Sequence, residues 1–238
     1  HTYHQNVEGT RIVLEAMAAA GVTKIVFSSS AAVYGTPDVP LVVEDLPKRP
    51  ASPYGESKLI GEWLIADQAR ATADTDAPLR HTSLRYFNVV GSADPSVYDT
   101  SPHNLFPIVF EKLIAGETPR INGDDYDTPD GTNVRDYVHV GDIAAAHVAA
   151  AQRLIAGEPI EAAYNLGSQN GLSVREIMDA MARVTGIAFT PEVGPRRPGD
   201  PDRIVATGEL AARDLDWQMR YSIDEMVRTG WEARQNAL

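Results

Sequence analysis

The amino-acid sequence predicts an α/β fold with a largely parallel sheet. Short apolar runs typical of buried strands alternate with stretches of helical periodicity along the whole chain. Hydrophobic residues make up 43% of the 238 positions, which is enough to bury a sizeable core. No internal repeat or low-complexity linker interrupts the alternation. These three observations favour one large or two modest domains over a disordered or fibrous chain.

The first third of the chain contains two expected helix–strand pairs. Apolar residues recur at a helical period over residues 7–20, and Lys24–Phe27 has the apolar character of a buried parallel strand. A second helix is expected over Pro53–Ala73, because proline suits the first helical turn. His81–Tyr86 is typical of the strand that follows it.

The same alternation continues to the end of the chain, after a domain change that we place at Asn88. Ser173 and Ser222 are suitable N-caps for two of the later helices. Asp94–Pro102 and Gly123–Gly131 are rich in Pro and Asp and are expected to be functional loops. Helices are expected over Leu105–Ala115, Asp142–Ile155, Val174–Thr185 and from Ser222 to Arg234, and strands over Val134–Val138 and Ala163–Leu166.

Charge and composition limit the partners that we expect. The formal net charge is −12, whereas a nucleic-acid backbone requires clustered Lys and Arg, so no nucleic-acid partner is expected. A small anionic ligand remains compatible, because a few Arg side chains in one pocket can hold a diphosphate. The chain has no cysteine and no apolar run long enough for a membrane helix. We therefore expect no disulfide, no membrane contact and no metal.

Tyr54 and Lys58 stand four residues apart on the second expected helix, so they share one helix face. Tyrosine ionises near pH 10, but a nearby ammonium favours the phenolate and makes tyrosine usable as a base. Upstream, the expected strand runs into serines 28–30. Ligands of open α/β sheets bind beyond the carboxyl ends of strands, so a serine hydroxyl there can meet the phenol and a substrate hydroxyl. Each feature alone is commonplace, but the combination indicates a catalytic site.

These residues belong to a larger set of motifs that spans essentially the whole chain. The acidic loop leading into Val134–Tyr137 is the most specific of them. On this set the sequence resembles the extended short-chain dehydrogenase/reductase superfamily and, within it, the UDP-glucose 4-epimerase (UDP-galactose 4-epimerase) family. The motifs are Asn6–Thr10, Ser28–Gly35, Ser52–Lys58, Leu84–Asn88, Asn104–Pro107, Gly123–Tyr126, Asp130–Val140, Tyr164–Gly167 and Arg196–Asp200.

The resemblance implies a Rossmann-like parallel sheet and a smaller α/β C-terminal substrate domain. Residues 1–87 would be the remaining part of the NAD-binding domain, and residues 88–238 mainly the nucleotide-sugar-binding domain, with some later segments returning to the first. The family opens with a Gly-rich turn that holds the NAD pyrophosphate, and no Gly-x-x-Gly-x-x-Gly occurs here. We expect that this N-terminal portion lies outside the sequence, and that these 238 residues alone bind NAD weakly.

The resemblance also implies a mechanism with NAD as the cofactor. Tyr54 would take the proton from the sugar 4-hydroxyl while hydride passes from C4 to NAD, and the 4-keto sugar would turn over and receive the hydride on its other face. Ser30 would relay a hydrogen bond at that hydroxyl. Lys58 would hold the nicotinamide ribose and lower the pKa of Tyr54. The expected cofactor-binding residues are Asn6, Ser28, Tyr54, Lys58 and Tyr86.

For the UDP-sugar substrate, the resemblance implies that Arg135 and Arg197 are the cationic partners of the diphosphate. Ile204 falls where the family limits room for an N-acetyl group, and we favour unacetylated sugars. Asn122 departs from the family, which often carries an aromatic residue there. His139 is expected to be structural. The expected substrate-binding residues are Asn88 and Asn104 near the diphosphate, Leu105, Arg135, Arg197, Asp200 as acceptor from the uridine ribose, and Ile204.

Two alternatives remain open at this point. One is another nucleotide-sugar enzyme of the same fold, such as a UDP-N-acetylglucosamine or UDP-glucuronate 4-epimerase or a decarboxylase. The other is a non-catalytic nucleotide-sugar-binding regulator, although the presence of Ser30, Tyr54 and Lys58 together counts against it. Family habit implies a homodimer and, with the lack of cysteine, a cytoplasmic location.

Overall fold

Two compact units make up residues 1–237, the part of the chain that the computed structural model describes. Unit 1 comprises His1–Phe87, Ala144–Leu166 and Ala206–Gln218. Unit 2 comprises Asn88–Ile143, Gly167–Val205 and the residues from Met219 onward. The chain therefore first changes unit at Asn88, where the sequence analysis placed the domain change, and then returns twice to unit 1.

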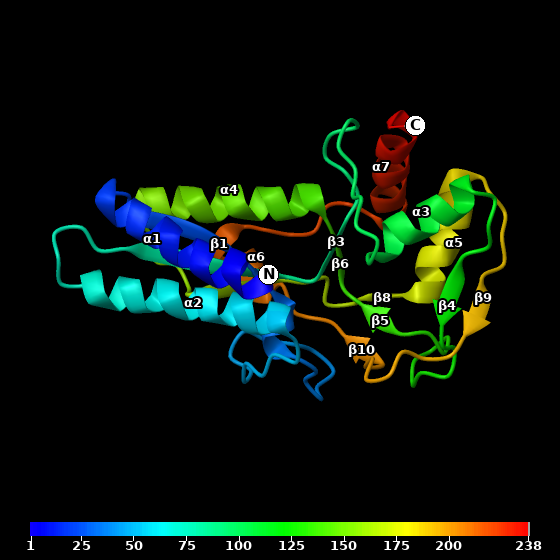
Figure 1. Cartoon of the computed structure of the whole chain (residues 1–238), viewed down its shortest axis with the longest axis horizontal. Coiled ribbons are helices and arrows are strands. Elements are labelled where there is room, and N and C mark those ends of the chain that lie inside the picture. The colour runs from blue at the N-terminus through cyan, green and yellow to red at the C-terminus, as the bar shows by residue number, and fades with distance from the viewer. Residues whose placement is uncertain (238) are drawn as a thin grey trace. The chain divides into compact units, whose positions relative to one another are not determined.

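Unit 1 is built on a three-stranded parallel sheet with strand order β1-β2-β7 (Figure 1). The strands are β1 (Lys24–Ser30), β2 (Arg80–Tyr86) and β7 (Ala163–Leu166). Ser30 is opposite Tyr86, and Tyr86 is opposite Leu166, so the three carboxyl ends lie at one edge of the sheet. This is the edge at which open α/β sheets bind ligands.

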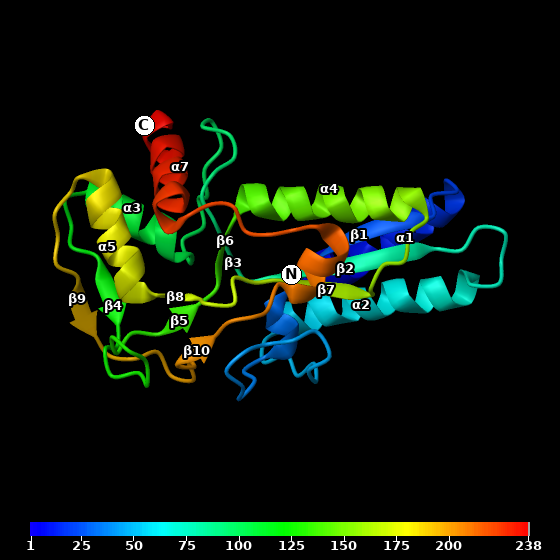
Figure 2. The ribbon, with the colours of Figure 1, turned by 180° about the vertical axis from the view of Figure 1, so that it is seen from behind.

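Helices cover both faces of this sheet. Figures 1 and 2 show α2 (Pro53–Thr72) on one side of the strands and α4 (Val140–Ala156) on the other. Alongside α2 lies α1 (Gly9–Ala19), which follows a π-helix, η1 (His4–Glu8). The remaining helices of unit 1 are the 3-10 helix η2 (Ala31–Tyr34) and α6 (Glu209–Leu215).

The position of α2 depends on its cap and on two glycines. Ser52 caps the helix by accepting a hydrogen bond from the Gly55 backbone N–H at 3.2 Å, and Pro53 occupies the first turn, as its fixed φ favours. A Cβ atom at Gly55 would come within 2.4 Å of the Ala32 carbonyl oxygen, and one at Gly61 within 2.7 Å of the Phe27 ring. The two glycines thus allow α2 to pack closely against the end of β1.

Unit 2 has three small sheets and three helices of its own. Its apolar core joins the helices and includes Phe106, Phe110, Met178, Met181 and Trp231. The sheets pair β3 (Asn88–Val90) with β6 (Tyr137–His139), β4 (Arg120–Asn122) with β9 (Glu192–Gly194), and the central β5 (Val134–Arg135) with both β10 (Arg203–Ile204) and β8 (Leu172–Ser173). The helices are α3 (Leu105–Ile114), α5 (Val174–Thr185) and α7 (Ile223–Asn236).

Most expected elements are present with small changes at their ends, and both expected serine caps form. Ser173 and Ser222 each close a capping box with the glutamate three residues later. The expected strand Val134–Val138 is wrong, because it is broken at Asp136 into β5 and β6. The Asp136 carboxylate accepts a hydrogen bond from the Ser168 backbone N–H at 2.8 Å, and its carbonyl oxygen accepts one from the Asn88 backbone N–H at 3.1 Å. Within residues 1–237 no helix is long and apolar enough to cross a membrane.

Candidate active site and ligand pocket

Ser30 is the last residue of β1 and begins the short helix that follows. Its hydroxyl oxygen accepts a hydrogen bond from the Ala32 backbone N–H at 3.2 Å, which caps η2, and the side chain is buried. The Ser30 hydroxyl lies close enough to the Tyr54 phenol to stabilise its ionised form by a hydrogen bond. The expected serine–tyrosine pair is therefore brought together in unit 1.

Tyr54 lies in the first turn of α2, and its side chain is 46% exposed. Burial of the rest of the side chain raises the pKa of Tyr54, while the hydrogen bond from Ser30 opposes this change by stabilising the phenolate. The Lys58 ammonium is 5.8 Å from the centre of the phenol ring. The lowering of the Tyr54 pKa by Lys58 stays a prediction.

Lys58 lies one turn after Tyr54 on the same face of α2. Its ammonium donates a hydrogen bond to the Ser28 carbonyl oxygen at 3.0 Å, and burial lowers the pKa of Lys58. An ammonium has three N–H donors, so two more are available for hydroxyl groups of a ligand. This donor set fits the ribose of a nicotinamide nucleotide.

The other expected cofactor residues surround the same end of the unit 1 sheet. The Asn6 amide lies in η1 and donates to the Ser57 hydroxyl at 2.8 Å, and Ser57 in turn donates to the Tyr54 carbonyl oxygen at 2.7 Å. Ser28 lies two residues before the end of β1, Tyr86 is the last residue of β2, and both contact His147. The imidazole Nε2 is 2.8 Å from the Ser28 hydroxyl, and its ring centre is 6.3 Å from that of Tyr86.

His147 was missed by sequence reasoning. It lies on α4, 119 residues after Ser28, and a single histidine on a helix carries no local signal of this contact. The sequence separation explains why only the folded chain brings the two residues together.

A buried ion pair connects α2 to β2 in unit 1. Arg85 donates two hydrogen bonds to the Glu62 carboxylate at 2.9 and 2.6 Å, and the two side chains are only 5% and 11% exposed. Glu62 also accepts a hydrogen bond from Ser29, and Arg85 donates to the Tyr34 hydroxyl at 2.8 Å. Because Glu62 lies one turn after Lys58, this network holds the face of α2 that carries Tyr54 and Lys58 against the strands. Sequence reasoning missed it.

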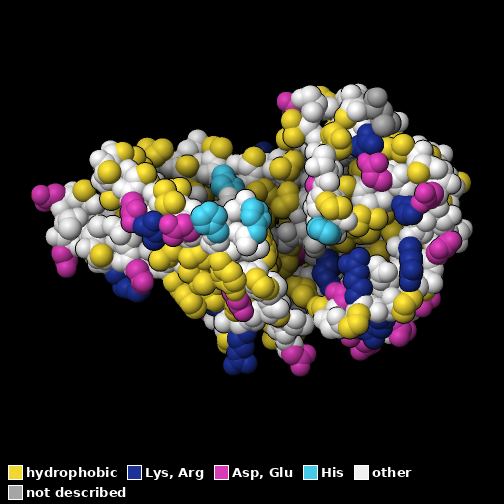
Figure 3. Space-filling view, in the orientation of Figure 1, with side chains coloured by type: hydrophobic (Ala, Val, Ile, Leu, Met, Phe, Trp, Pro, Cys, Tyr) yellow, Lys and Arg dark blue, Asp and Glu magenta, His cyan; other side chains and the backbone are white. Residues whose placement is uncertain are grey.

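Unit 2 contains a separate pocket of about 200 Å³. Figure 3 shows Lys and Arg side chains gathered over the strands of unit 2 on this face. Ile204 is not among the residues that line the pocket; it lies on β10, opposite Arg135 in the β5 register. The expected substrate residues that do line it are Asn88, Asn104, Leu105, Arg135, Arg197 and Asp200.

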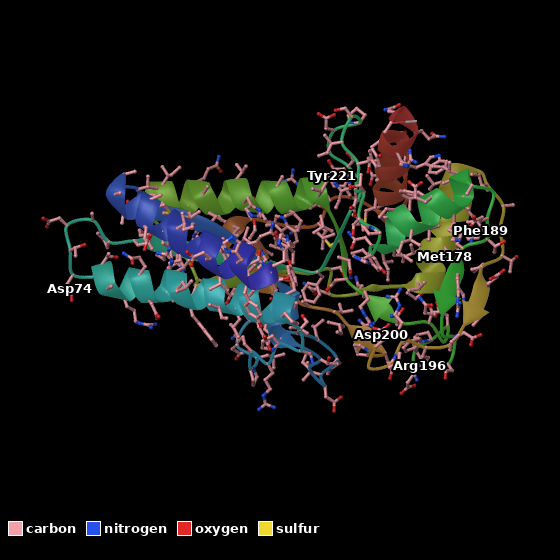
Figure 4. The ribbon with its side chains drawn as sticks, in the orientation of Figure 1. Asp74, Met178, Phe189, Arg196, Asp200 and Tyr221 are labelled. Atoms are coloured by element: carbon pink, nitrogen blue, oxygen red, sulfur yellow. The ribbon has the colours of Figure 1, made fainter. Side chains whose placement is uncertain are left out.

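Arg135 and Asp200 form the central ion pair of this pocket, with side chains 13% and 23% exposed. Asp200 also accepts hydrogen bonds from the Asn133 amide at 2.9 Å and the Tyr126 hydroxyl at 3.3 Å. Figure 4 shows Asp200 beside β5 and β10, with Arg196 on the same segment. The Arg135 guanidinium is fixed by this ion pair and by a hydrogen bond that it donates to the Pro201 carbonyl oxygen at 2.7 Å.

The two expected asparagines are held by protein groups. The Asn88 amide donates to the Asp136 carbonyl oxygen at 2.8 Å, and the Asn104 amide donates to the Asp99 carboxylate at 2.6 Å. Asn104 begins α3 without capping it through its side chain. Asn104, Leu105 and Ile108 line the pocket, so the first turn of α3 borders it, and a helix N-terminus stabilises anions.

His139 has the structural role expected of it. The ring is fully buried and stacks on Tyr221, with 3.7 Å between the ring centres. The Gly141 backbone N–H donates to Nδ1 at 2.9 Å, so Nε2 carries the proton and donates to the Thr229 hydroxyl at 2.9 Å. Burial lowers the pKa of His139, which keeps the ring neutral.

Comparison with known proteins agrees with this geometry. A family model described as the NAD dependent epimerase/dehydratase family matches residues 1–167. UDP-glucose 4-epimerase 4 of Oryza sativa subsp. japonica is 43% identical over 236 residues, which are 96% of this chain and 62% of that protein. UDP-glucose 4-epimerase of Lactobacillus helveticus is 41% identical over 235 residues, which are 97% of this chain and 69% of that protein.

A solved structure has a similar fold. The structure of UDP-glucose-4-epimerase from Stenotrophomonas maltophila with bound NAD and formylated UDP-arabinopyranose aligns with a TM-score of 0.90 at 38% identity. The alignment covers 99% of this chain and 70% of that chain.

These matches confirm the resemblance read from the motifs and the α/β class with parallel sheets. The chain spans less than two thirds of the length of the rice relative. The family match includes the residues of the unit 1 site and Arg135 of the unit 2 pocket. The chain belongs to the NAD-dependent epimerase/dehydratase family.

Proposed function

We propose that this chain is the catalytic and substrate-binding part of an NAD-dependent isomerase that interconverts UDP-glucose and UDP-galactose. The observation that carries the proposal is the group of Ser30, Tyr54 and Lys58 at the carboxyl end of the unit 1 sheet, with the Ser30 hydroxyl beside the Tyr54 phenol. A hydroxyl, a phenol and an ammonium in this order can remove and return the proton of a secondary alcohol. The named relatives, which are UDP-glucose 4-epimerases, support the same activity.

The protein groups have distinct tasks in this reaction. Tyr54 receives the proton of the sugar 4-hydroxyl and returns it, while Ser30 holds that oxygen by a hydrogen bond. Lys58 contributes two free donors for ribose hydroxyls and, as a cation, favours the phenolate once such a ligand fixes it near Tyr54. Asn6, Ser28, Tyr54, Lys58 and Tyr86 would hold NAD, which would supply a reversible hydride acceptor for C4 of the sugar.

The unit 2 pocket supports a nucleotide diphosphate as the recognised group. Arg135, Arg197 and the first turn of α3 border the same 200 Å³ pocket, and guanidinium groups bind phosphate oxygens in pairs. Asp200 keeps a lone pair for a ribose hydroxyl beside its three protein partners. We expect these residues, with Asn88, Asn104 and Leu105, to hold the UDP moiety.

The sugar preference is also a proposal. Ile204 does not line the pocket. Its branched side chain would therefore affect which sugars the pocket accepts only indirectly, through the position of β10. We favour unacetylated hexoses over N-acetylhexosamines as substrates.

The test is conversion of UDP-galactose to UDP-glucose by protein made from its complete reading frame and purified without added NAD. A parallel reaction uses UDP-N-acetylgalactosamine. Conversion without added cofactor, faster with UDP-galactose, is the expected result. A folded protein that carries NAD but converts neither sugar would be a sister nucleotide-sugar enzyme. Protein that binds UDP but never carries NAD and never turns over would be a regulator.

We further propose a cytoplasmic homodimer. Exposed apolar side chains on the outer helices of unit 1 support the dimer, because Ile12 and Val13 on α1 and Trp63 on α2 are each about half exposed. Light scattering should give twice the chain mass, and Trp63→Glu should give a monomer. A monomeric wild-type protein would rule the dimer out. Cell fractionation tests the location.

A further inference from the structure

The pairing of β4 with β9 brings Asn122 close to the segment that carries Arg197. The two strands are parallel, with Asn122 opposite Gly194, and the next backbone N–H, that of Gly123, donates to the Gly194 carbonyl oxygen at 2.8 Å. Both strands therefore end at the same level. The chain that continues from β9 reaches Arg197 three residues later, at the rim of the unit 2 pocket.

The Asn122 amide holds the Arg197 guanidinium by two hydrogen bonds. In the amide orientation that satisfies its neighbours, the side-chain oxygen accepts from Nε and from Nη2 of Arg197, both at 3.2 Å. A guanidinium has five N–H donors in a rigid plane, so three remain for a ligand. Asn122 and Arg197 both line the pocket.

The neighbouring arginines have partners of a different kind. Arg196 lies 3.9 Å from the centre of the Tyr126 ring and forms ion pairs with Asp202 and, at 3.6 Å, with Asp125. Arg135 is paired with Asp200. Carboxylates fix these two guanidinium groups and also cancel their charge. The amide of Asn122 fixes Arg197 without cancelling its charge.

We propose that Asn122 is a positioning residue, which presents Arg197 to the diphosphate of the nucleotide sugar with its full positive charge. The proposal rests on the proposed function, since it assigns Arg197 to that diphosphate. It explains why an uncharged acceptor is suited to this position. The isosteric carboxylate would bind the guanidinium more tightly but would compete with the phosphates for it.

The experiment measures UDP binding calorimetrically with Asn122→Ala and Asn122→Asp. Loss of the two hydrogen bonds leaves Arg197 free to adopt other rotamers, so Asn122→Ala should weaken UDP binding by about fivefold to tenfold. Asn122→Asp should weaken it more, by about tenfold to a hundredfold. In turnover assays both variants should raise KM and leave kcat within about twofold, because neither touches the reacting atoms.

A merely structural acceptor would behave differently, because aspartate accepts the same two hydrogen bonds. UDP affinity restored to the wild-type value in Asn122→Asp would therefore overturn the proposal. A second comparison uses Arg197→Ala: Asn122→Ala should have no further effect in that background. An equal loss of affinity in both backgrounds would mean that Asn122 acts independently of Arg197, and would also overturn it.

Arg196→Ala is the matched control, since it removes an arginine from the same segment whose charge is already compensated. It should change UDP affinity far less than Arg197→Ala. Wild-type protein that does not bind UDP would refute the proposed function itself. Wild-type binding with unchanged affinity in both Asn122 variants would refute only the role of Asn122.

Discussion

The unit 1 site and the unit 2 pocket use charge in opposite ways. At the unit 1 site, Tyr54 and Lys58 can each gain or lose a proton, and burial moves both towards their neutral forms by raising one pKa and lowering the other. In the unit 2 pocket the cations are arginines, which stay protonated, and Arg135 is held by Asp200. The difference indicates that unit 1 is suited to moving a proton and unit 2 to holding a fixed negative charge.

The largest expected effect is on turnover, from Tyr54→Phe. The variant keeps the ring but removes the hydroxyl that exchanges the proton, so kcat should fall by about 10³-fold to 10⁴-fold. Tyr98→Phe, in a loop of unit 2, is the matched control and should retain activity. If Tyr54→Phe kept a tenth of the wild-type kcat, the proton would be handled elsewhere and the assignment of chemistry to unit 1 would fail.

The next effect is on stability, from Glu62→Ala. The substitution leaves the Arg85 guanidinium buried without its carboxylate, which should lower the free energy of unfolding by about 3–5 kcal/mol. Denaturant titration measures it. Asp67→Ala, on the same helix, removes an exposed ion pair with Arg70 and should have little effect. Equal losses in the two variants would show that the buried network does not support α2.

Removal of a pocket cation should affect binding and not chemistry. Arg135→Ala loses charge-assisted hydrogen bonds, so UDP affinity should fall by about tenfold to a hundredfold while kcat at saturating substrate stays within a few-fold. Calorimetry and initial rates measure the two quantities. Arg183→Ala, which removes an exposed pair with Asp224, is the control. A fall in kcat as large as the fall in affinity would contradict the separation of the two sites.

The smallest effect concerns the titration of Tyr54. Because burial raises the pKa of Tyr54, its phenol should ionise at higher pH than free tyrosine, whose pKa is about 10. The difference in phenolate absorbance between wild-type protein and Tyr54→Phe, measured without NAD, should therefore increase only above that pH. A midpoint below 10 would mean that Lys58 or Ser30 outweighs burial even without a ligand.

The two regions also differ in how far the sequence predicted them. Tyr54 and Lys58 lie on one helix, so their spacing, together with the serines that follow the first expected strand, indicated the unit 1 chemistry. Helices with strong caps, such as α5 after Ser173, were likewise predictable from local signals. The network of Arg85 and Glu62 was missed, because ion pairs between a helix and a strand have no fixed spacing.

The unit 2 pocket could be predicted only through resemblance. Its residues come from β3, α3, β4, β5, β6, α5 and the segment after β9, with loop residues between them, and no local pattern connects them. The contact between Asn122 and Arg197 joins β4 to the segment that follows β9, and both strands are too short for sequence periodicity to identify. The break of the expected strand at Asp136 has the same origin, since its partners Ser168 and Asn88 are distant in sequence.

The most direct test of the division between the two units is a calorimetric titration of UDP into Tyr54→Phe, made from the complete reading frame, beside the wild-type protein. We expect equal affinities within about twofold, in a variant that has lost turnover, because the proposed binding cations belong to unit 2 and the proposed proton acceptor to unit 1. A loss of UDP affinity comparable to that of Arg135→Ala would contradict this division.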